Sequence, residues 1–192
     1  MQEKTLVLIK PDGVRKSISG KIISRFEDAG LKIVAIKMVW ADEELAKNHY
    51  YLDEEWAKGI YEKTKNSYEK EGKKLEEKDH LELGKKIQAY LTEYIKEGPV
   101  IAIVLEGPHA VELIRKIIGA TEPRSSAPGT IRSDFASIES YPRADSDKRA
   151  IRNLIHASDS VENAKREISL WFASEEIHGN YKTVHDFLLE KN

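Results

Sequence analysis

The feature that most constrains the fold is an unbroken apolar run from Val100 to Leu105. A run this short, with no polar residue on either face, is typical of a strand that helices cover on both sides. Strand-like composition recurs from Thr5 to Lys10 and from Leu31 to Trp40, and Ser133 to Glu139 offers a fourth strand. Pro11-Asp12-Gly13 is turn chemistry that stops the first of these strands, so Lys10 is expected at a strand end.

Apolar residues recur at helical spacing between the predicted strands. Gly30 follows one such stretch and Gly119 closes another, as expected for helix C-caps, and residues 160–172 predict a third helix. The apolar faces consist of Ile22, Ile23, Phe26 and Ala29, then Val111, Leu113, Ile114, Ile117 and Ile118, then Val161, Ala164, Ile168, Trp171 and Phe172. This order of elements predicts an α/β sandwich with helices packed on a four-stranded sheet, which a ferredoxin-like βαββαβ core fits. The pattern alone leaves open whether the sheet is antiparallel or doubly wound.

Composition narrows the class of protein. The 192 residues are 40% hydrophobic, which is normal for a globular chain, so residues 1–192 are expected to form a single domain. The chain has no cysteine, which excludes disulfides and thiolate metal sites. With no apolar leader and no long apolar run, it is expected to be a soluble, cytoplasmic protein with no membrane partner. The net charge of −2 argues against a dedicated nucleic-acid-binding protein.

The strongest chemical signal is the run Asn153-Leu154-Ile155-His156-Ala157-Ser158-Asp159. It sets an imidazole among small and polar neighbours, so His156 is the first candidate nucleophile. Glu167 lies beside the apolar face of the predicted 160–172 helix, where an unpaired carboxylate is costly. A bond to one imidazole nitrogen would satisfy this carboxylate and leave the other nitrogen free to attack. The alternative is structural, because Ser158, Asp159 and Ser160 also make an ordinary helix N-cap.

Three motifs in one order carry a family resemblance. They are Lys10-Pro11-Asp12-Gly13-Val14 after the first strand, Pro128-Gly129-Thr130-Ile131-Arg132 in the middle, and the run from Asn153 to Asp159. The chain resembles the nucleoside diphosphate kinases over roughly residues 4 to 56 and 98 to 180, and three motifs together are far more specific than one. The resemblance favours an antiparallel four-stranded sheet over a doubly wound one.

The resemblance also implies roles for named residues. His156 is the expected nucleophile, supported by Glu167, Ser158 and Tyr50. The expected phosphate and sugar contacts are Lys10, Arg115, Thr121, Arg132 and Asn153. Lys10 offers a compact charge and the two arginines offer planar forks for phosphate oxygens.

The reaction implied by the resemblance is a ping-pong transfer. The terminal phosphoryl group of a nucleoside triphosphate, typically ATP, passes to His156 and then to a nucleoside diphosphate. Mg²⁺ is expected on the nucleotide phosphates, and because phosphate oxygens and water hold most of its coordination sites, no dedicated protein metal motif is expected. A homo-oligomer, specifically a hexamer, is the expected assembly.

Two other function classes stay open at this point. A family-like binding or regulatory module would keep the nucleotide site without transfer, although the joint presence of Lys10, Arg132, Asn153, His156 and Glu167 favours the enzyme. A nucleic-acid-binding protein would show salt-sensitive binding that His156→Ala leaves intact. A P-loop kinase is excluded, because no glycine-rich loop leads into Lys and a hydroxyl residue.

The chain departs from the family pattern between Tyr51 and Pro99, where it is roughly thirty residues longer, too long for a structureless loop in a compact domain. We predict a helical insertion at about 57–97, in which the charged stretch from Lys58 to Lys86 forms a solvated hairpin. A lid over the nucleotide is the functional alternative. The resemblance implies an aromatic base-stacking position near this insertion, but no Phe-Phe pair stands there, which leaves Trp56 or Tyr61 as candidates.

A second departure is a polar extension at about 140–151. Pro142, Asp145, Ser146 and Asp147 predict a loop here. Its positive residues, Arg143, Lys148, Arg149 and Arg152, are compatible with phosphate or a neighbouring subunit, but an exposed surface is favoured because isolated surface charges contribute little.

Overall fold

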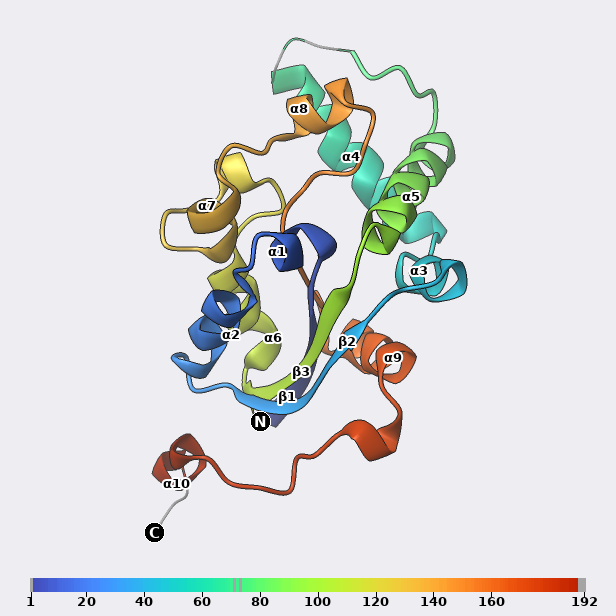
Figure 1. Cartoon of the computed structure of the whole chain (residues 1–192). Coiled ribbons are helices and arrows are strands. Elements are labelled where there is room, and N and C mark those ends of the chain that lie inside the picture. The colour runs from blue at the N-terminus through green and yellow to red at the C-terminus, as the bar shows by residue number, and fades with distance from the viewer. Residues whose placement is uncertain (1, 71, 73, 190–192) are drawn as a thin grey trace.

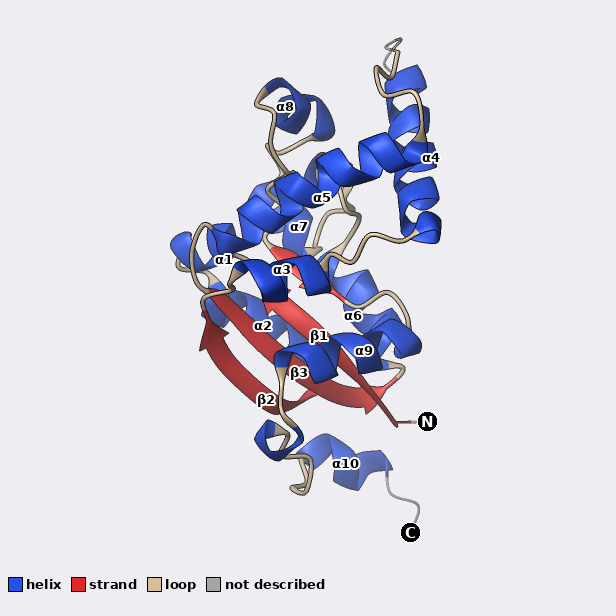
Figure 2. Ribbon diagram, turned by 90° about the vertical axis from the view of Figure 1, so that its right-hand side faces the viewer, coloured by secondary structure: helices blue, strands red, loops and turns tan. Residues whose placement is uncertain are grey.

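The computed structural model describes residues 2–70, 72 and 74–189, and its centre is a four-stranded antiparallel sheet (Figures 1 and 2). The strand order is β2-β3-β1-β4. The bounds are β1 Gln2–Ile9, β2 Lys32–Val39, β3 Val100–Pro108 and β4 Ile155–Ala157. The apolar run that opened the sequence analysis lies in β3, between β1 and β2, so it is a central strand as predicted. The ferredoxin-like antiparallel arrangement is confirmed and the doubly wound alternative is wrong.

Helices cover both faces of this sheet (Figure 2). Their bounds are α1 Pro11–Arg15, α2 Ser19–Glu27, α3 Glu43–His49, α4 Glu54–Lys70, α5 His80–Lys96, α6 Ala110–Ile118, α7 Ile131–Ala136, α8 Tyr141–Ser146, α9 Val161–Trp171 and α10 Val184–Leu189. Two single turns lie at Pro123–Ser125 and Ser174–Glu176. Among the described residues, no helix is both long and apolar enough to cross a membrane.

Strand β1 divides the interior into two cores. Val7 and Ile9 pack into one core with α2 and α6, and Leu6 and Leu8 pack into the other with the residues of α3 and α9. This alternation follows from the period of two along a strand. All four side chains are fully buried, so β1 is a rigid base for whatever follows Ile9.

Two sequence expectations are wrong. Ser133 to Glu139 is no strand, because Thr130 caps a helix there by accepting a hydrogen bond from the Ser133 amide. The fourth strand is β4, whose three residues are too few to show the alternation by which strands are recognised. The polar extension at 140–151 is not all loop, since Ser140 caps α8 and Pro142 occupies its first turn.

The chain forms a helical hairpin, α4–α5, where an insertion at about 57–97 was predicted. The two helices approach closely at Gly84, where a Cβ atom would lie 2.9 Å from the Leu52 side chain and 3.1 Å from Ala57. The end of α5 belongs to the core, because Tyr94 and Ile95 are buried. The hairpin is therefore anchored at one end and projects at the other (Figure 1).

Candidate active site

Strand pairing brings the first and third motifs together. β4 pairs antiparallel with β1, which sets His156 opposite Leu8, and Lys10 follows β1 at the same edge. The Lys10 amide donates to the Leu154 carbonyl over 2.8 Å, which continues the ladder past the strand end. Residues about 145 positions apart in the sequence thus become neighbours through backbone hydrogen bonds.

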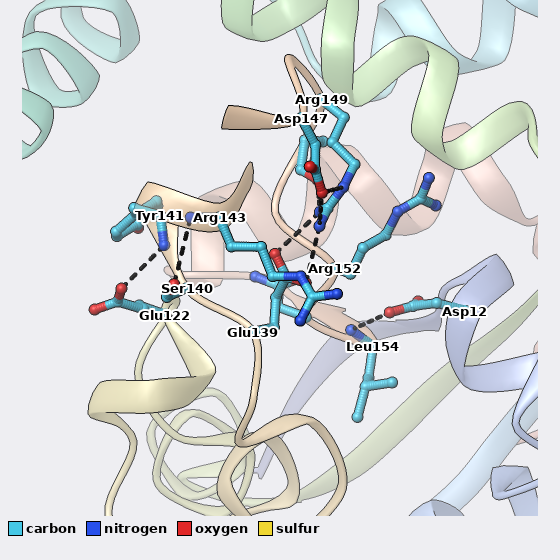
Figure 3. Close-up of polar contacts among 12 residues, drawn as sticks. Asp12, Glu122, Glu139, Ser140, Tyr141, Arg143, Asp147, Arg149, Arg152 and Leu154 are labelled. Atoms are coloured by element: carbon cyan, nitrogen blue, oxygen red, sulfur yellow. Dashed lines mark hydrogen bonds and ion pairs between the residues drawn. The ribbon is translucent and has the colours of Figure 1, made fainter. Parts of the chain in front are cut away.

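Leu154 has a left-handed backbone, with φ of 67°. This conformation costs a residue with a Cβ atom free energy and persists only where its surroundings enforce it. Asp12 enforces it here, because its Oδ2 accepts from the Leu154 amide at 3.1 Å while the Leu154 carbonyl is held by Lys10 (Figure 3). This turn lies between Asn153 and β4, so it fixes the backbone from which the Asn153 and His156 side chains project.

Lys10 is a buried cation with a short list of partners. Its Nζ donates to Asn153 Oδ1 at 2.8 Å and lies 5.0 Å from the centre of the Tyr94 ring. Burial, and then the charge of Arg132, lower the pKa of Lys10 to about 7. Neither of these two partners carries a negative charge, so an incoming phosphate would supply the counter-charge of the Lys10 ammonium group.

Arg132 is a structural and electrostatic centre. Its guanidinium donates to three backbone carbonyls, those of Gly119 at 2.9 Å, Ile155 at 2.7 Å and Asn153 at 3.3 Å. Three of its five N–H groups are thus used and two are left for a ligand. Burial, and then the charge of Arg115, lower the pKa of Arg132 to about 10, so it stays charged at pH 7.

His156 and Glu167 lie together as the sequence predicts. His156 Nε2 is 2.9 Å from Glu167 Oε2, and the Ser158 hydroxyl donates to the same oxygen at 2.6 Å. Burial would raise the pKa of Glu167, but the attraction and hydrogen bond of His156 bring it down to about 2. Glu167 is therefore ionised, and it holds the proton of His156 on Nε2, which leaves the Nδ1 lone pair free.

His49 is a neighbour that sequence reasoning missed. Its ring lies edge-on to His156, with centroids 4.4 Å apart, and its Nδ1 accepts a hydrogen bond from Trp171 Nε1 at 3.3 Å. Indole can only donate, so the neutral ring of His49 carries its proton on Nε2. Burial lowers the pKa of His49 well below its usual value, so this ring adds no charge beside His156.

The other predicted site residues occupy more distant positions. Arg115 is exposed on α6, close enough to Arg132 to lower its pKa, and the Thr121 carbonyl accepts from Asn153 Nδ2 at 2.9 Å. Tyr50 is buried next to His49, and burial raises the pKa of its hydroxyl above the usual value. Trp56 and Tyr61 lie on α4, half-buried.

Three more residues outside the predicted catalytic and nucleotide-binding set shape the site. Asp12 holds the turn at Leu154, Tyr94 lies beneath Lys10, and Arg152 covers the same Tyr94 ring at 4.7 Å while pairing with Glu97. Asp12 lies inside the first motif and Arg152 directly precedes the third, so the sequence could have indicated that both lie near the site. No motif includes Tyr94, because its position at the site depends on the packing of the hairpin.

A possible metal-ligand cluster also lies here. His49, His156 and Glu167 each offer one ligand atom, and these atoms lie within 4.8 Å of one another. Two nitrogens and one carboxylate do not suit Mg²⁺, which prefers oxygen ligands. The Trp171 donor also keeps the proton of His49 on Nε2, so this ring is poorly prepared as a ligand.

Comparison with known proteins agrees with this geometry. A family model described as nucleoside diphosphate kinase matches residues 3–73 and 67–177. The nucleoside diphosphate kinase of Pyrobaculum aerophilum is 45% identical over 179 residues, which cover 91% of this chain and 97% of that protein. A crystal structure of an NDP kinase from Pyrobaculum aerophilum matches with a TM-score of 0.88 and 43% identity, covering 93% of this chain and 100% of that one. The nucleoside-diphosphate kinase of Borrelia burgdorferi, in a transition-state mimic with vanadate and ADP, matches with a TM-score of 0.77 and 37% identity, covering 96% and 95%. The chain therefore belongs to the nucleoside diphosphate kinase family of phosphotransferases.

Proposed function

We propose that the protein transfers the terminal phosphoryl group of a nucleoside triphosphate, typically ATP, to a nucleoside diphosphate through a phosphohistidine at His156. The observation that carries this proposal is the contact of His156 Nε2 with Glu167 Oε2 at 2.9 Å, which leaves Nδ1 as the free nucleophile. The His156 side chain is 22% exposed, so a phosphate can reach it.

In the first half-reaction the Nδ1 lone pair attacks the terminal phosphorus. A P–N bond forms as the bond from this phosphorus to the bridging oxygen breaks, and the nucleoside diphosphate leaves with the electron pair. The proton of His156 stays on Nε2 in its hydrogen bond with Glu167. The second half-reaction is the reverse, with a different nucleoside diphosphate as acceptor.

Fixed cations lower the barrier for this transfer. Lys10, Arg115 and Arg132 would stabilise the charge on the transferring group and the leaving oxygen, and little of this stabilisation needs rearrangement because Lys10 and Arg132 are already held. Asn153 would hold the sugar hydroxyl or the bridging oxygen. Thr121 would contact phosphate from the rim, Tyr50 would orient the site by hydrogen bonding near Glu167 or the transferring phosphate, and Ser158 would support Glu167.

The family uses a divalent cation in catalysis, and we propose that it is Mg²⁺. Asp12 is occupied by the Leu154 and Gly13 amides, and the phosphate-facing side chains are cations, so these residues suit a metal that arrives on nucleotide phosphates. When bound, Mg²⁺ would neutralise part of the phosphate charge.

Intact mass spectrometry tests the function. After incubation with Mg²⁺ and ATP and removal of nucleotide, we expect one acid-labile phosphoryl group per chain, localised to His156, which GDP then removes as GTP forms. Absence of the adduct, with nucleotide bound and no transfer on prolonged incubation, would instead support the binding-module alternative.

A homo-oligomer is the proposed assembly. β2 is an edge strand whose Ile33 and Val34 carbonyls accept hydrogen bonds from Tyr181 and His178, and further along the strand Ile36, Met38 and Trp40 are 50%, 62% and 69% exposed. Proteins seldom leave such an edge uncovered, so a second copy is the expected partner. Sedimentation analysis of the wild type against Met38→Lys tests this, and a hexamer stays a prediction.

A cytoplasmic location also stays a prediction, which cell fractionation can check. The lack of dedicated nucleic-acid binding stays a prediction as well.

A further inference from the structure

A buried tyrosine near the end of α5 faces two cations at the site. Tyr94 is 1% exposed and is the largest of the described side chains that the fold buries completely. The centre of its ring lies 5.0 Å from Lys10 Nζ and 4.7 Å from Arg152 Cζ. Because so little of its side chain is exposed, Tyr94 offers no surface on which a nucleotide could bind. Its influence on the proposed transfer is therefore expected to pass through the two cations.

Arg152 has a counter-charge on the helix that supplies the ring. Its Nη2 lies 2.5 Å from Oε1 of Glu97, which is the C-cap residue of α5 and lies three positions after Tyr94. Arg15 of α1 lies 3.5 Å from the other oxygen of the same carboxylate. The ion pair with Glu97 thus holds the Arg152 guanidinium against the ring, and the charge of Arg152 is balanced there.

Lys10 lies among groups that mostly oppose its charge. Burial, and then the charges of Arg132 and Arg152, lower the pKa of Lys10. Asp12 opposes this effect, and the resulting pKa is about 7. The carboxylate of Asp12 accepts hydrogen bonds from two backbone amides, at 3.0 Å and 3.1 Å. His49, which also lies close enough to interact with Lys10, is neutral.

The ring of Tyr94 supplies an attraction that favours the charged form of Lys10. The face of an aromatic ring carries partial negative charge, and it attracts a cation within about 6 Å of its centre, most strongly where water is excluded. An ammonium group gains this attraction and a neutral amine does not. The hydroxyl of Tyr94 adds little, because it has no hydrogen-bond partner among the described residues and burial raises its pKa well above the usual value.

We propose that Tyr94 is a positioning residue for the phosphoryl transfer, whose ring face holds the Lys10 ammonium group where the nucleotide phosphates contact it. This proposal rests on the proposed function for the position of the phosphates. A cation that is fixed before the nucleotide arrives stabilises the developing charge without rearrangement. The packing of the end of α5 against the domain therefore sets the position and the charge of Lys10.

Titration of Lys10 in the ligand-free protein tests this role without relying on transfer. Labelling with ¹³C-lysine gives an NMR signal from Lys10 Cε, which its loss in Lys10→Gln identifies, and the pH at the midpoint of its shift reports the pKa. Tyr94→Leu keeps much of the apolar volume and removes the ring face, so we expect the midpoint to fall by about one pH unit. Tyr94→Phe keeps the ring face, so its midpoint should lie within about 0.3 pH unit of the wild type.

Phe26→Leu is the matched control, since Phe26 is an equally buried ring that packs in the core with residues of α6. We expect this variant to lose stability as Tyr94→Leu does, but to leave the Lys10 midpoint unchanged. An unchanged midpoint in Tyr94→Leu, or an equal fall in Phe26→Leu, would overturn the proposal.

Fluorinated phenylalanines in place of Tyr94 keep the test decisive if Tyr94→Leu folds poorly. Successive ring fluorines withdraw charge from the face of the ring and change its shape little. We expect the Lys10 midpoint to fall with each added fluorine, because the attraction weakens stepwise. A ring that only fills space would give no such trend, and that result would contradict the proposal.

The rate of phosphohistidine formation connects the ring to the reaction. At saturating ATP and pH 7 we expect Tyr94→Leu to form the adduct about tenfold more slowly, as for loss of one desolvated contact between a cation and a ring, and Tyr94→Phe to stay within about twofold of the wild type. A wild-type rate in Tyr94→Leu would reject the role of Tyr94. Absence of the adduct in the wild type would reject the transfer function instead, so the two failures are distinguishable.

Discussion

The proposed phosphate-binding residues and the α4–α5 hairpin are stabilised by different physical means. Lys10, Arg132 and Asn153 are buried, and backbone and side-chain hydrogen bonds fix each of them. The projecting part of the hairpin is charged, and exposed pairs such as Glu54–Lys58 at 3.1 Å cover its surface. Exposed pairs contribute little to stability, whereas a buried charge must keep its partners. The proposed chemistry, which needs fixed geometry, therefore lies on buried, hydrogen-bonded residues beside the ends of β1 and β4, and the exposed ion pairs lie on the hairpin outside the sheet.

The largest expected effect is from His156→Ala, which removes the proposed nucleophile. Turnover should fall by at least about 10⁴-fold, because no covalent intermediate can form. A coupled assay for triphosphate formation measures this, and unchanged tripolyphosphate affinity serves as the control. Normal turnover by this variant would reject the mechanism.

Arg132→Ala tests whether a residue proposed to bind phosphate also stabilises the fold. Three backbone carbonyls, two of them in buried hydrogen bonds, lose their donor, so we expect the free energy of unfolding to fall by about 3 kcal/mol or more. Urea denaturation measures the change. If the free energy of unfolding is unchanged and only nucleotide affinity drops, the buried hydrogen bonds of Arg132 contribute little to stability. The proposed phosphate-binding residues and the hairpin would then differ less in stability than the burial of Arg132 implies.

Glu167→Gln keeps the shape of the pair and removes its charge. Transfer should slow by about 10²-fold without vanishing, because His156 remains but loses basicity and orientation.

The pKa of Glu167 also predicts a loss of stability in acid. This pKa falls to about 2 in the folded protein, below its ordinary value of 4.5, so the contribution of Glu167 to stability is present above pH 4.5. That contribution is lost as the pH falls from 4.5 towards 2, and the Gln variant should lack this part of the acid transition.

Lys10 predicts the pH dependence of nucleotide binding. Its pKa of about 7 means that it loses its charge as the pH rises above 7, so ADP affinity should fall by up to about tenfold per pH unit there. Calorimetry between pH 6 and 9 measures this, and Lys10→Gln corrects for titration of ADP itself. The sign for stability is opposite, since the unfolded chain binds more protons between pH 7 and 10.5 and stability rises with pH in that range.

The smallest effect is expected in the hairpin. Lys58→Ala removes one exposed partner of Glu54, and the free energy of unfolding should change by less than about 0.5 kcal/mol. Thermal unfolding measures this change, and transfer activity equal to that of the wild type is the control. A loss above 2 kcal/mol would show that the surface pairs of the hairpin carry far more of the stability than such exposed pairs usually do.

Removal of residues 60–95, an obvious way to ask whether the hairpin is a lid, is not a clean experiment. It would delete Tyr94 and Ile95, which are buried in the domain, and also Gln88, which donates to the Tyr50 carbonyl at 2.7 Å. A loss of nucleotide affinity in this deletion would therefore not separate a lid from a folding defect.

The sequence alone predicted the central strand at Val100 to Leu105, the helix closed by Gly119, and the pairing of His156 with Glu167. It also predicted the helix before Gly30, but that helix ends at Glu27 with Asp28, not Gly30, as its C-cap. Local periodicity and helix caps determine the strand and the helices. The cost of burying an unpaired carboxylate predicts the pairing of Glu167 with His156. The sequence also determined the family through three motifs. It could not locate β4, because three residues carry no period, or α8, whose turn-forming residues also suit a helix start.

Only the tertiary structure decided which distant residues meet. Pairing of β4 with β1 brings Asn153 to Lys10, packing of α3 on α9 brings His49 to His156, and the hairpin brings Tyr94 beneath Lys10. These contacts depend on strand register and helix packing, which the whole chain sets at once. A residue's neighbours along the sequence determine its local conformation, but its burial, its pKa and its partner come from chain segments that no local pattern identifies.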